Sequence, residues 1–214
     1  MTAPSRPGED HRLALRRWWT ERCTPGHPAW VSREQAFRMM AEAGLRVIEH
    51  ARLPERPAET SPGDRVVVYT DEAAHAGDGK TLMPWHQAAR EHPGALCSRF
   101  VAPGGESWRR LKIGEKRFWL HYTAPDWRSN GGTEGDVTFV REENSAADPA
   151  VPGWPAVIWA VDYVREGETL YAIDLNPAPG IQATGVMHEL SAFSVHGELT
   201  QYLTRHGAAF LGQP

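Results

Sequence analysis

Apolar residues recur at helical spacing near the N-terminus, over residues 33–43. Ser32 precedes this stretch in the position of an N-cap, and Gln35 occupies the capping-box position three residues later. Gly44 follows the stretch and supplies a stop signal. The pattern therefore predicts a helix over 33–43. Weaker patterns of the same kind predict three further helical stretches, at 10–23, 83–91 and 185–203.

Strand patterns occupy much of the remaining chain. Runs of β-branched residues and two-residue alternation predict strands at 47–53, 66–69, 95–101, 108–113, 117–122, 137–140, 157–164 and 169–175. The turns Gly114-Glu115 and Glu166-Gly167 each join two of these strands into a hairpin. Residues 76–81 are rich in glycine and predict a flexible, turn-forming loop. Antiparallel hairpins beside helices indicate an α+β fold.

Composition narrows the class of protein. The 214 residues suit one domain or two small lobes and are enough to bury a core. The net charge of -4 gives no overall basic footprint, so we expect no nucleic-acid partner. No stretch approaches roughly 18 apolar residues, and residues 1–10 hold no apolar signal core. We therefore expect a cytoplasmic protein without a membrane span. Two cysteines are too few for a disulfide framework or a zinc cluster.

Oxygen-bearing side chains gather in the last predicted hairpin. Alternation places Asp174 and Asn176 on one face of its second strand, and Asp162 lies on the neighbouring strand. Three converging oxygen donors suit a hard cation such as Mg²⁺, which keeps several waters and takes phosphate oxygens as further ligands. The same pattern also fits a polar sheet face that ends in a Pro/Gly turn.

The segment 126–132, Asp-Trp-Arg-Ser-Asn-Gly-Gly, is a second candidate for chemistry. Arg128 presents a planar fork that suits phosphate or carboxylate oxygens. Asn130 offers both an amide donor and an acceptor, and the glycines let the backbone approach a ligand closely. A solvated surface loop is the alternative interpretation of this segment.

Together these blocks resemble the ATP-grasp superfamily, in particular ligases that add amino acids to peptide or protein carboxylates, and glutathione-synthase-like enzymes. The resemblance rests on the segment 126–132, on Val161-Asp162-Tyr163 and on the strand end 174–180, in that order. It implies an α+β ATP-grasp fold in which two lobes of antiparallel sheet and helices hold a nucleotide between them. The implied division is a leader with a short helix at 1–30, a smaller lobe at 31–101, and a larger lobe with the metal site at 102–214.

A looser similarity extends upstream from about residue 30. Arg33 opens the first matching helix, where the family usually has a phosphate-contacting lysine. The strand 66–69 resembles one that usually ends in a second ATP lysine, and here Tyr69 holds that place. Residues 76–82 resemble the mobile glycine-rich loop over the phosphates. Only three of the 23 basic residues are lysines, so we expect arginine to replace lysine at phosphate, with a different geometry.

The resemblance implies an ATP-dependent carboxylate–amine ligase. ATP would convert a carboxylate into an acylphosphate, which an amine then attacks, so ATP and Mg²⁺ are the implied cofactors. An amino acid, a peptide or a small carboxylic acid is the implied substrate. The implied residues are Asp162, Asp174 and Asn176 for the metal, Arg128 and Asn130 for catalysis, and Arg33, Lys80, Arg99, Phe100, Val101, Arg109 and Lys112 for the nucleotide.

Two alternative functions remain open. A non-catalytic ATP-grasp-like module could hold a nucleotide or peptide as the partner of a larger synthetase. Tyr69 favours this module, and the three predicted magnesium ligands argue against it. A kinase-like phosphoryl transferase on the same fold is the other. The ligases usually carry a Rossmann-like front domain that helps bind the acceptor, and only about 30 residues precede the matching part here. A homodimer or a partner protein would then supply the missing domain.

Overall fold

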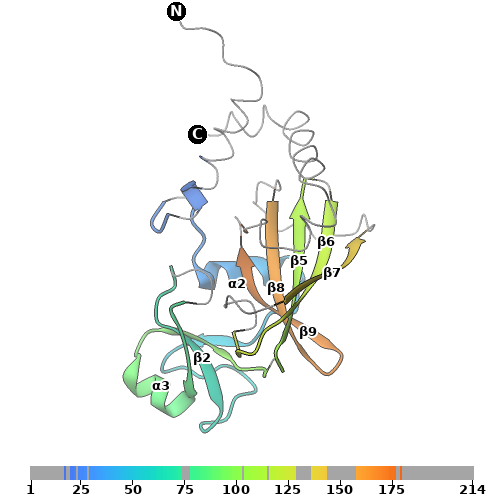
Figure 1. Cartoon of the computed structure of the whole chain (residues 1–214). Coiled ribbons are helices and arrows are strands. Elements are labelled where there is room, and N and C mark those ends of the chain that lie inside the picture. The colour runs from blue at the N-terminus through green and yellow to red at the C-terminus, as the bar shows by residue number, and fades with distance from the viewer. Residues whose placement is uncertain are drawn as a thin grey trace, which may run out of the picture.

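In the part of the chain that the computed structural model describes, the strands form two antiparallel β-sheets with helices beside them (Figure 1). The structure describes residues 17, 20–22, 24–27, 29–73, 78–102, 104–114, 116–128, 136–143, 158–176 and 179. One sheet has four strands and the other has five, which confirms the α+β class predicted from the sequence. Within the described ranges, no helix is long and apolar enough to cross a bilayer.

Helix α2 (Arg33–Glu42) begins where the sequence predicts it. The Ser32 hydroxyl accepts a hydrogen bond from the backbone N–H of Gln35 at 3.2 Å, which satisfies a donor that has no partner within the helix. Gly44 has a φ of 80°, a left-handed conformation that glycine adopts readily at the end of a helix. The buried face of α2 packs against strand β9 (Thr169–Asn176).

The four-stranded sheet is formed by residues between 50 and 99. Its strands are β1 (His50–Arg52), β2 (Arg65–Tyr69), β3 (Lys80–Pro84) and β4 (Leu96–Arg99), in the order β1-β4-β2-β3. Helix α3 (Trp85–Glu91) packs against this sheet. Its Ala88 joins Val66, Val68 and Cys97 in a small apolar core. The β-branched run predicted as a strand is therefore present as β2.

The five-stranded sheet contains both predicted hairpins. Its strands are β5 (Glu106–Ile113), β6 (Lys116–Thr123), β7 (Asp136–Glu143), β8 (Ile158–Glu166) and β9, in the order β7-β6-β5-β8-β9. β7 extends beyond the predicted 137–140, because it pairs with most of β6 across a register shift at Trp119/Leu120. The predicted hairpin turns thus account for four of the five strands, and the pairing of β5 with β8 joins the two hairpins at the centre of the sheet.

Strand β3 differs from the sequence prediction. The pattern predicts a loop through Lys80 and a helix from 83, but residues Lys80–Pro84 pair with the whole of β2, from Tyr69↔Lys80 to Arg65↔Pro84. This pairing satisfies backbone groups of β2 that would otherwise lie at a sheet edge. The helix therefore begins only at Trp85.

The segment between α2 and β1 connects the two sheets. The N–H of Ile48 donates to the carbonyl of Ala172 at 3.0 Å, and the N–H of Ala172 donates to the carbonyl of Arg46 at 2.8 Å. The predicted strand 47–53 is therefore divided, because its first part pairs with β9 and only its later part enters the small sheet as β1. Of the predicted helix over 10–23, residues 17 and 20–22 are described and helical, whereas 185–203 lies outside the described residues.

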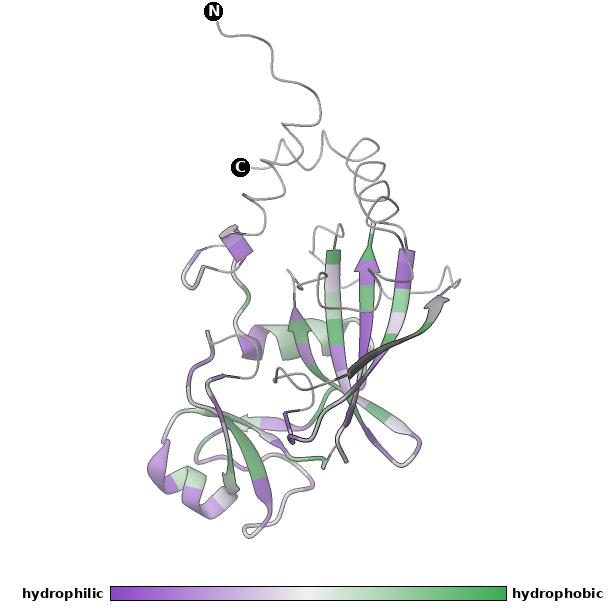
Figure 2. Cartoon of the chain, viewed as in Figure 1, coloured by the Kyte–Doolittle hydropathy of each residue, from purple (hydrophilic) through white to green (hydrophobic). Residues whose placement is uncertain are grey.

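One apolar core joins α2 to both sheets. Phe37 and Met40 of the helix belong to the same buried cluster as Leu96 of β4 and Val161 of β8. Figure 2 shows apolar residues along β2 and along the strands of the five-stranded sheet. Helix α2 lies where the two sheets meet (Figure 1). Residues at the start of this helix are thereby brought close to the facing strands.

Candidate functional site

A cleft lies between the two sheets and takes its walls from both. Its empty volume is about 550 Å³, open solvent included. Its lining residues are Val67, Tyr69, Lys80, Ser98, Arg99, Phe100 and Val101 from the first half of the chain, and Trp127, Arg128, Asp162, Val164, Ile173 and Asp174 from the second.

Two ion pairs, one nearly buried and one partly buried, stand at the inner wall of the cleft. Arg109 donates from Nε to Asp162 Oδ1 at 2.6 Å and from Nη2 to Oδ2 at 2.9 Å, a bidentate pair with both side chains nearly buried. Arg33, the first residue of α2, donates from Nη1 to Asp174 Oδ1 at 2.7 Å. Burial alone would raise the pKa of Asp174, but the charges of Arg33 and Lys80 outweigh burial and hold that pKa below its ordinary value.

The sheet register explains why the two aspartates meet. Asp162 and Asp174 are directly opposite on the antiparallel strands β8 and β9, so their side chains share a face. Asn176 lies two residues further along β9 and has the same parity. The three predicted metal ligands therefore share one face of the sheet. Of the four carboxylate oxygens of Asp162 and Asp174, however, three accept hydrogen bonds from Arg33 and Arg109.

Lys80 and Tyr69 form the opposite wall. They are directly paired between β2 and β3, with the Lys80 ammonium 6.0 Å from the centre of the Tyr69 ring. The Arg33 guanidinium is 4.7 Å from the same ring, and the Tyr69 hydroxyl shares a 3.1 Å hydrogen bond with Ser98 Oγ. Burial lowers the pKa of Lys80, and the positive charge of Arg33 lowers it further. The ring at the expected lysine position thus contacts two cations from neighbouring elements.

The segment 126–128 closes one side of the cleft. Arg128 donates to Asp126 Oδ2 from Nε at 2.7 Å, and its backbone N–H donates to Oδ1 of the same carboxylate at 3.2 Å. Trp127, which lies between these two residues in the sequence, packs edge to face against Phe100, with ring centroids 6.2 Å apart. Arg128, Phe100 and Trp127 are therefore brought to one cleft. Asn130, predicted to act beside Arg128, lies outside the described residues.

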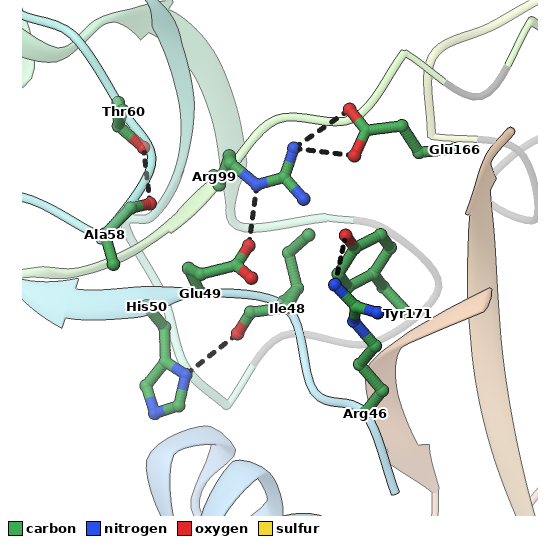
Figure 3. A network of polar contacts seen from close by, with 9 residues as sticks. All are labelled: Arg46, Ile48, Glu49, His50, Ala58, Thr60, Arg99, Glu166 and Tyr171. Atoms are coloured by element: carbon green, nitrogen blue, oxygen red, sulfur yellow. Dashed lines mark hydrogen bonds and ion pairs between the residues drawn. The ribbon is translucent and has the colours of Figure 1, made fainter. Parts of the chain in front are cut away.

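Arg99 is placed differently from its neighbours Phe100 and Val101. It lies at the edge of the cleft, but its guanidinium is held by two carboxylates (Figure 3). Nε donates to Glu49 at 2.6 Å, and Nη1 donates to the two carboxylate oxygens of Glu166 at 3.0 and 3.1 Å. Glu49 precedes β1 and Glu166 ends β8, so Arg99 joins the two sheets. Sequence reasoning missed both glutamates.

Lys112 is not brought to the cleft with the other predicted residues. It lies three positions after Arg109 in β5, whose pairing with both neighbours is regular, so the two side chains point to opposite faces of the sheet. Its directly opposed residues are Arg117 and Trp159. The sequence prediction that Lys112 contacts the nucleotide is therefore corrected by the register of β5.

No family model and no curated protein matches the chain. Solved structures do match. D-alanine–D-alanine ligase from Bacillus anthracis, in complex with ATP, has 12% identity and a TM-score of 0.52, over 81% of this chain and 66% of that one. The ATP-grasp ligase PsnB, in complex with a minimal precursor, has 13% identity and a TM-score of 0.54, over 84% of this chain and 63% of its own. The chain has the ATP-grasp fold. It spans about two thirds of the length of these two proteins.

The resemblance inferred from the sequence is thus confirmed for the ATP-grasp fold. At such low identity the similarity shows the fold alone, so the roles assigned to individual residues stay predictions. At the cleft, Lys80 and Arg128 lie among the lining residues with Asp162 and Asp174, and Arg109 and Arg33 bind these two aspartates. The arrangement presents several cations to any anion that enters between the sheets.

Proposed function

We propose that this chain is an ATP-dependent carboxylate–amine ligase. The observation that supports this most is the concentration of charged groups at the inner cleft. They include four cations, Arg33, Lys80, Arg109 and Arg128, and three carboxylates, Asp126, Asp162 and Asp174. The excess of positive charge suits a triphosphate, whose charge must be compensated in a closed site. The ATP-grasp fold, which the chain shares with two ligases, supports the same reaction class.

In the proposed reaction, a carboxylate oxygen of the substrate attacks the γ-phosphorus of ATP. The bond from that phosphorus to the β–γ bridging oxygen breaks, and ADP leaves. An amine then attacks the carbonyl carbon of the acylphosphate, which forms the C–N bond, expels phosphate and releases a proton. Such a reaction depends on positioning and on fixed charge around the transferring phosphoryl group. Lys80 of β3 and Arg128, which follows β6, both line the cleft and supply that charge.

Oxygen donors and an apolar wall complete the proposed site. Asp162, Asp174 and Asn176 fit a divalent cation by their chemistry and by their shared face, and they would hold Mg²⁺. When bound, the ion would neutralise part of the phosphate charge. Phe100 and Trp127 form the apolar surface against which a nucleotide base would pack.

The proposed substrate is an amino acid, a peptide or a small carboxylic acid in the cytoplasm. Nucleic acid is not proposed as a partner, since the net charge is -4. The proposed protein partners are a second copy of the chain or another protein that helps to bind the acceptor.

A nucleotide- or peptide-binding module without turnover is the second candidate. The observation that favours it is the occupation of both aspartates by arginine, because a catalytic metal must compete for those oxygens. Tyr69 at the expected lysine position favours it too.

An assay of ADP release, with ATP and Mg²⁺ supplied, separates the ligase from the kinase-like enzyme and from the binding module. The full chain is incubated with panels of amino acids, peptides and small carboxylic acids, with and without an amine. A ligase releases ADP only when carboxylate and amine are both present. ADP release with a carboxylate alone indicates a kinase-like enzyme, and nucleotide binding without release indicates the module. Asp174→Asn should reduce turnover by roughly a thousandfold, the scale of a lost metal contact. Near-normal turnover in that variant would contradict the metal assignment.

A further inference from the structure

The arginines at the two predicted metal-ligand carboxylates are part of the folded framework. Arg109 lies within β5, next to β8, and its side chain is 12% exposed. Arg33 is the first residue of α2, and its side chain is 10% exposed. Each guanidinium is therefore held at its aspartate by a helix or a strand rather than by a loop.

These contacts leave little room for a bare divalent cation. A small divalent ion such as Mg²⁺ needs about six oxygen ligands at roughly 2.0–2.1 Å. Both oxygens of Asp162 and one of Asp174 already accept hydrogen bonds from guanidinium groups. Lys80 stands near the same carboxylates and contributes to the field at Asp174. Two arginines and this lysine outnumber the two aspartates, so the local charge repels a lone dication.

Arg33 also has a donor that the protein does not use. Its Nε is buried and, among the described residues, has no hydrogen-bond partner. A buried donor without a partner is unfavourable, and a phosphate oxygen would satisfy it. Arginine binds phosphate with the same fork geometry that it uses for carboxylate. Nε is therefore the atom through which Arg33 would first bind an incoming phosphate.

We propose that Arg33 and Arg109 are built-in counterions of the metal site, so that a divalent cation enters only together with the nucleotide. In the free protein the guanidinium groups neutralise Asp162 and Asp174. On binding, the guanidinium groups transfer to phosphate oxygens, and the released carboxylates face the cation that accompanies the phosphates. This inference rests on the proposed function, because it requires that the cleft binds a nucleoside triphosphate.

A titration of the full chain with Mn²⁺ tests the counterion role without any turnover. Binding is measured by the loss of the EPR signal of the free ion. The wild-type protein alone should bind Mn²⁺ negligibly at submillimolar concentration. Arg33→Gln removes the charge from Asp174 and should tighten Mn²⁺ binding by about tenfold or more. The double variant Arg33→Gln/Asp174→Asn should lose that gain. Arg52→Gln is the matched control, because Arg52 pairs with Glu34 and Glu72 outside the cleft.

Calorimetry with a non-hydrolysable ATP analogue, with and without Mn²⁺, supplies the second arm. The wild-type protein should bind the analogue about tenfold or more tightly when Mn²⁺ is present. Tight Mn²⁺ binding by the wild-type protein alone, or no gain in Arg33→Gln, overturns the counterion role and leaves the ligase proposal standing. Failure to bind the analogue under either condition overturns the proposed nucleotide site itself.

Discussion

Replacement of Lys80 by methionine separates ligand binding from stability in this cleft. The ammonium group is buried opposite Asp174 and beside Arg33, and burial lowers its pKa, so its charge is unfavourable in the free protein. A bound triphosphate would make the charged form of Lys80 favourable, because it provides a charged hydrogen-bond acceptor for the ammonium group. Such a bond contributes about 1.5–3 kcal/mol. Lys80→Met should therefore weaken ATP binding by roughly ten- to a hundredfold.

The same variant should keep or increase its resistance to urea, because methionine fills a similar volume without a buried charge. Affinity is measured by calorimetry at fixed Mg²⁺ and ionic strength, and stability by the urea midpoint. Lys116→Met is the control for loss of one positive charge, since Lys116 begins β6 at the far end of the β5–β6 hairpin. Unchanged affinity in Lys80→Met, or an equal loss in Lys116→Met, would refute the placement of Lys80 at the phosphates.

Other residues give three further expectations. Lys112→Met should leave ATP affinity within about twofold of wild type, because the side chain faces away from the cleft; a tenfold loss by calorimetry would contradict the register argument. Arg99→Ala should lower the free energy of unfolding by about 1–2 kcal/mol, since it removes a partly buried pair with Glu49 and a more exposed pair with Glu166 that links the sheets; a urea midpoint equal to wild type would refute this. The hydrogen bond from Arg99 lowers the pKa of Glu166, so its contribution is present above the ordinary pKa near 4.5 and is lost as the pH falls through the lowered value. Glu166→Gln should accordingly flatten the acid side of the stability profile, and an unchanged profile would count against the pairing. Ser32→Ala should lower stability by about 1 kcal/mol through loss of the α2 cap, as measured by urea unfolding, and no loss would mean that the cap is dispensable.

The sequence was sufficient for the features that depend on local pattern. Ser32 and Gly44 mark the ends of α2 because capping and the left-handed end are local chemistry. The turn Glu166-Gly167 marks the β8–β9 hairpin for the same reason. Alternation along β9 also places Asp174 and Asn176 on one face. Strict alternation from the turn would pair Asp162 with Ile173, however, and only the register shift between Asp162 and Tyr163 brings Asp162 opposite Asp174. The addition of Asp162 to the shared face therefore needed the structure.

Partners that are distant in sequence could not be predicted in this way. Arg33 is 141 residues from Asp174, and Arg109 is 53 residues from Asp162. Periodicity reports which face a residue occupies, but it does not report which element packs on that face. The two ion pairs, and with them the occupation of the carboxylates, emerge only from the packing of α2 and β5 around the last hairpin.

Two errors have different physical origins. Lys80 was assigned to a loop because glycines precede it, whereas the unsatisfied edge of β2 recruits the segment as strand β3. Lys112 was assigned to the nucleotide by resemblance, although three positions along one strand already separate it from the face of Arg109. The first error needed tertiary structure for its correction, and the second needed only the parity rule.

The central claim is that the cleft between the two sheets binds ATP. Calorimetric titration of the full chain with ATP in the presence of Mg²⁺ tests it most directly, with Lys80→Met titrated in parallel. We expect saturable binding at one site per chain and a clear loss of affinity in the variant. Absence of binding, or binding that Lys80→Met leaves unchanged, would contradict it.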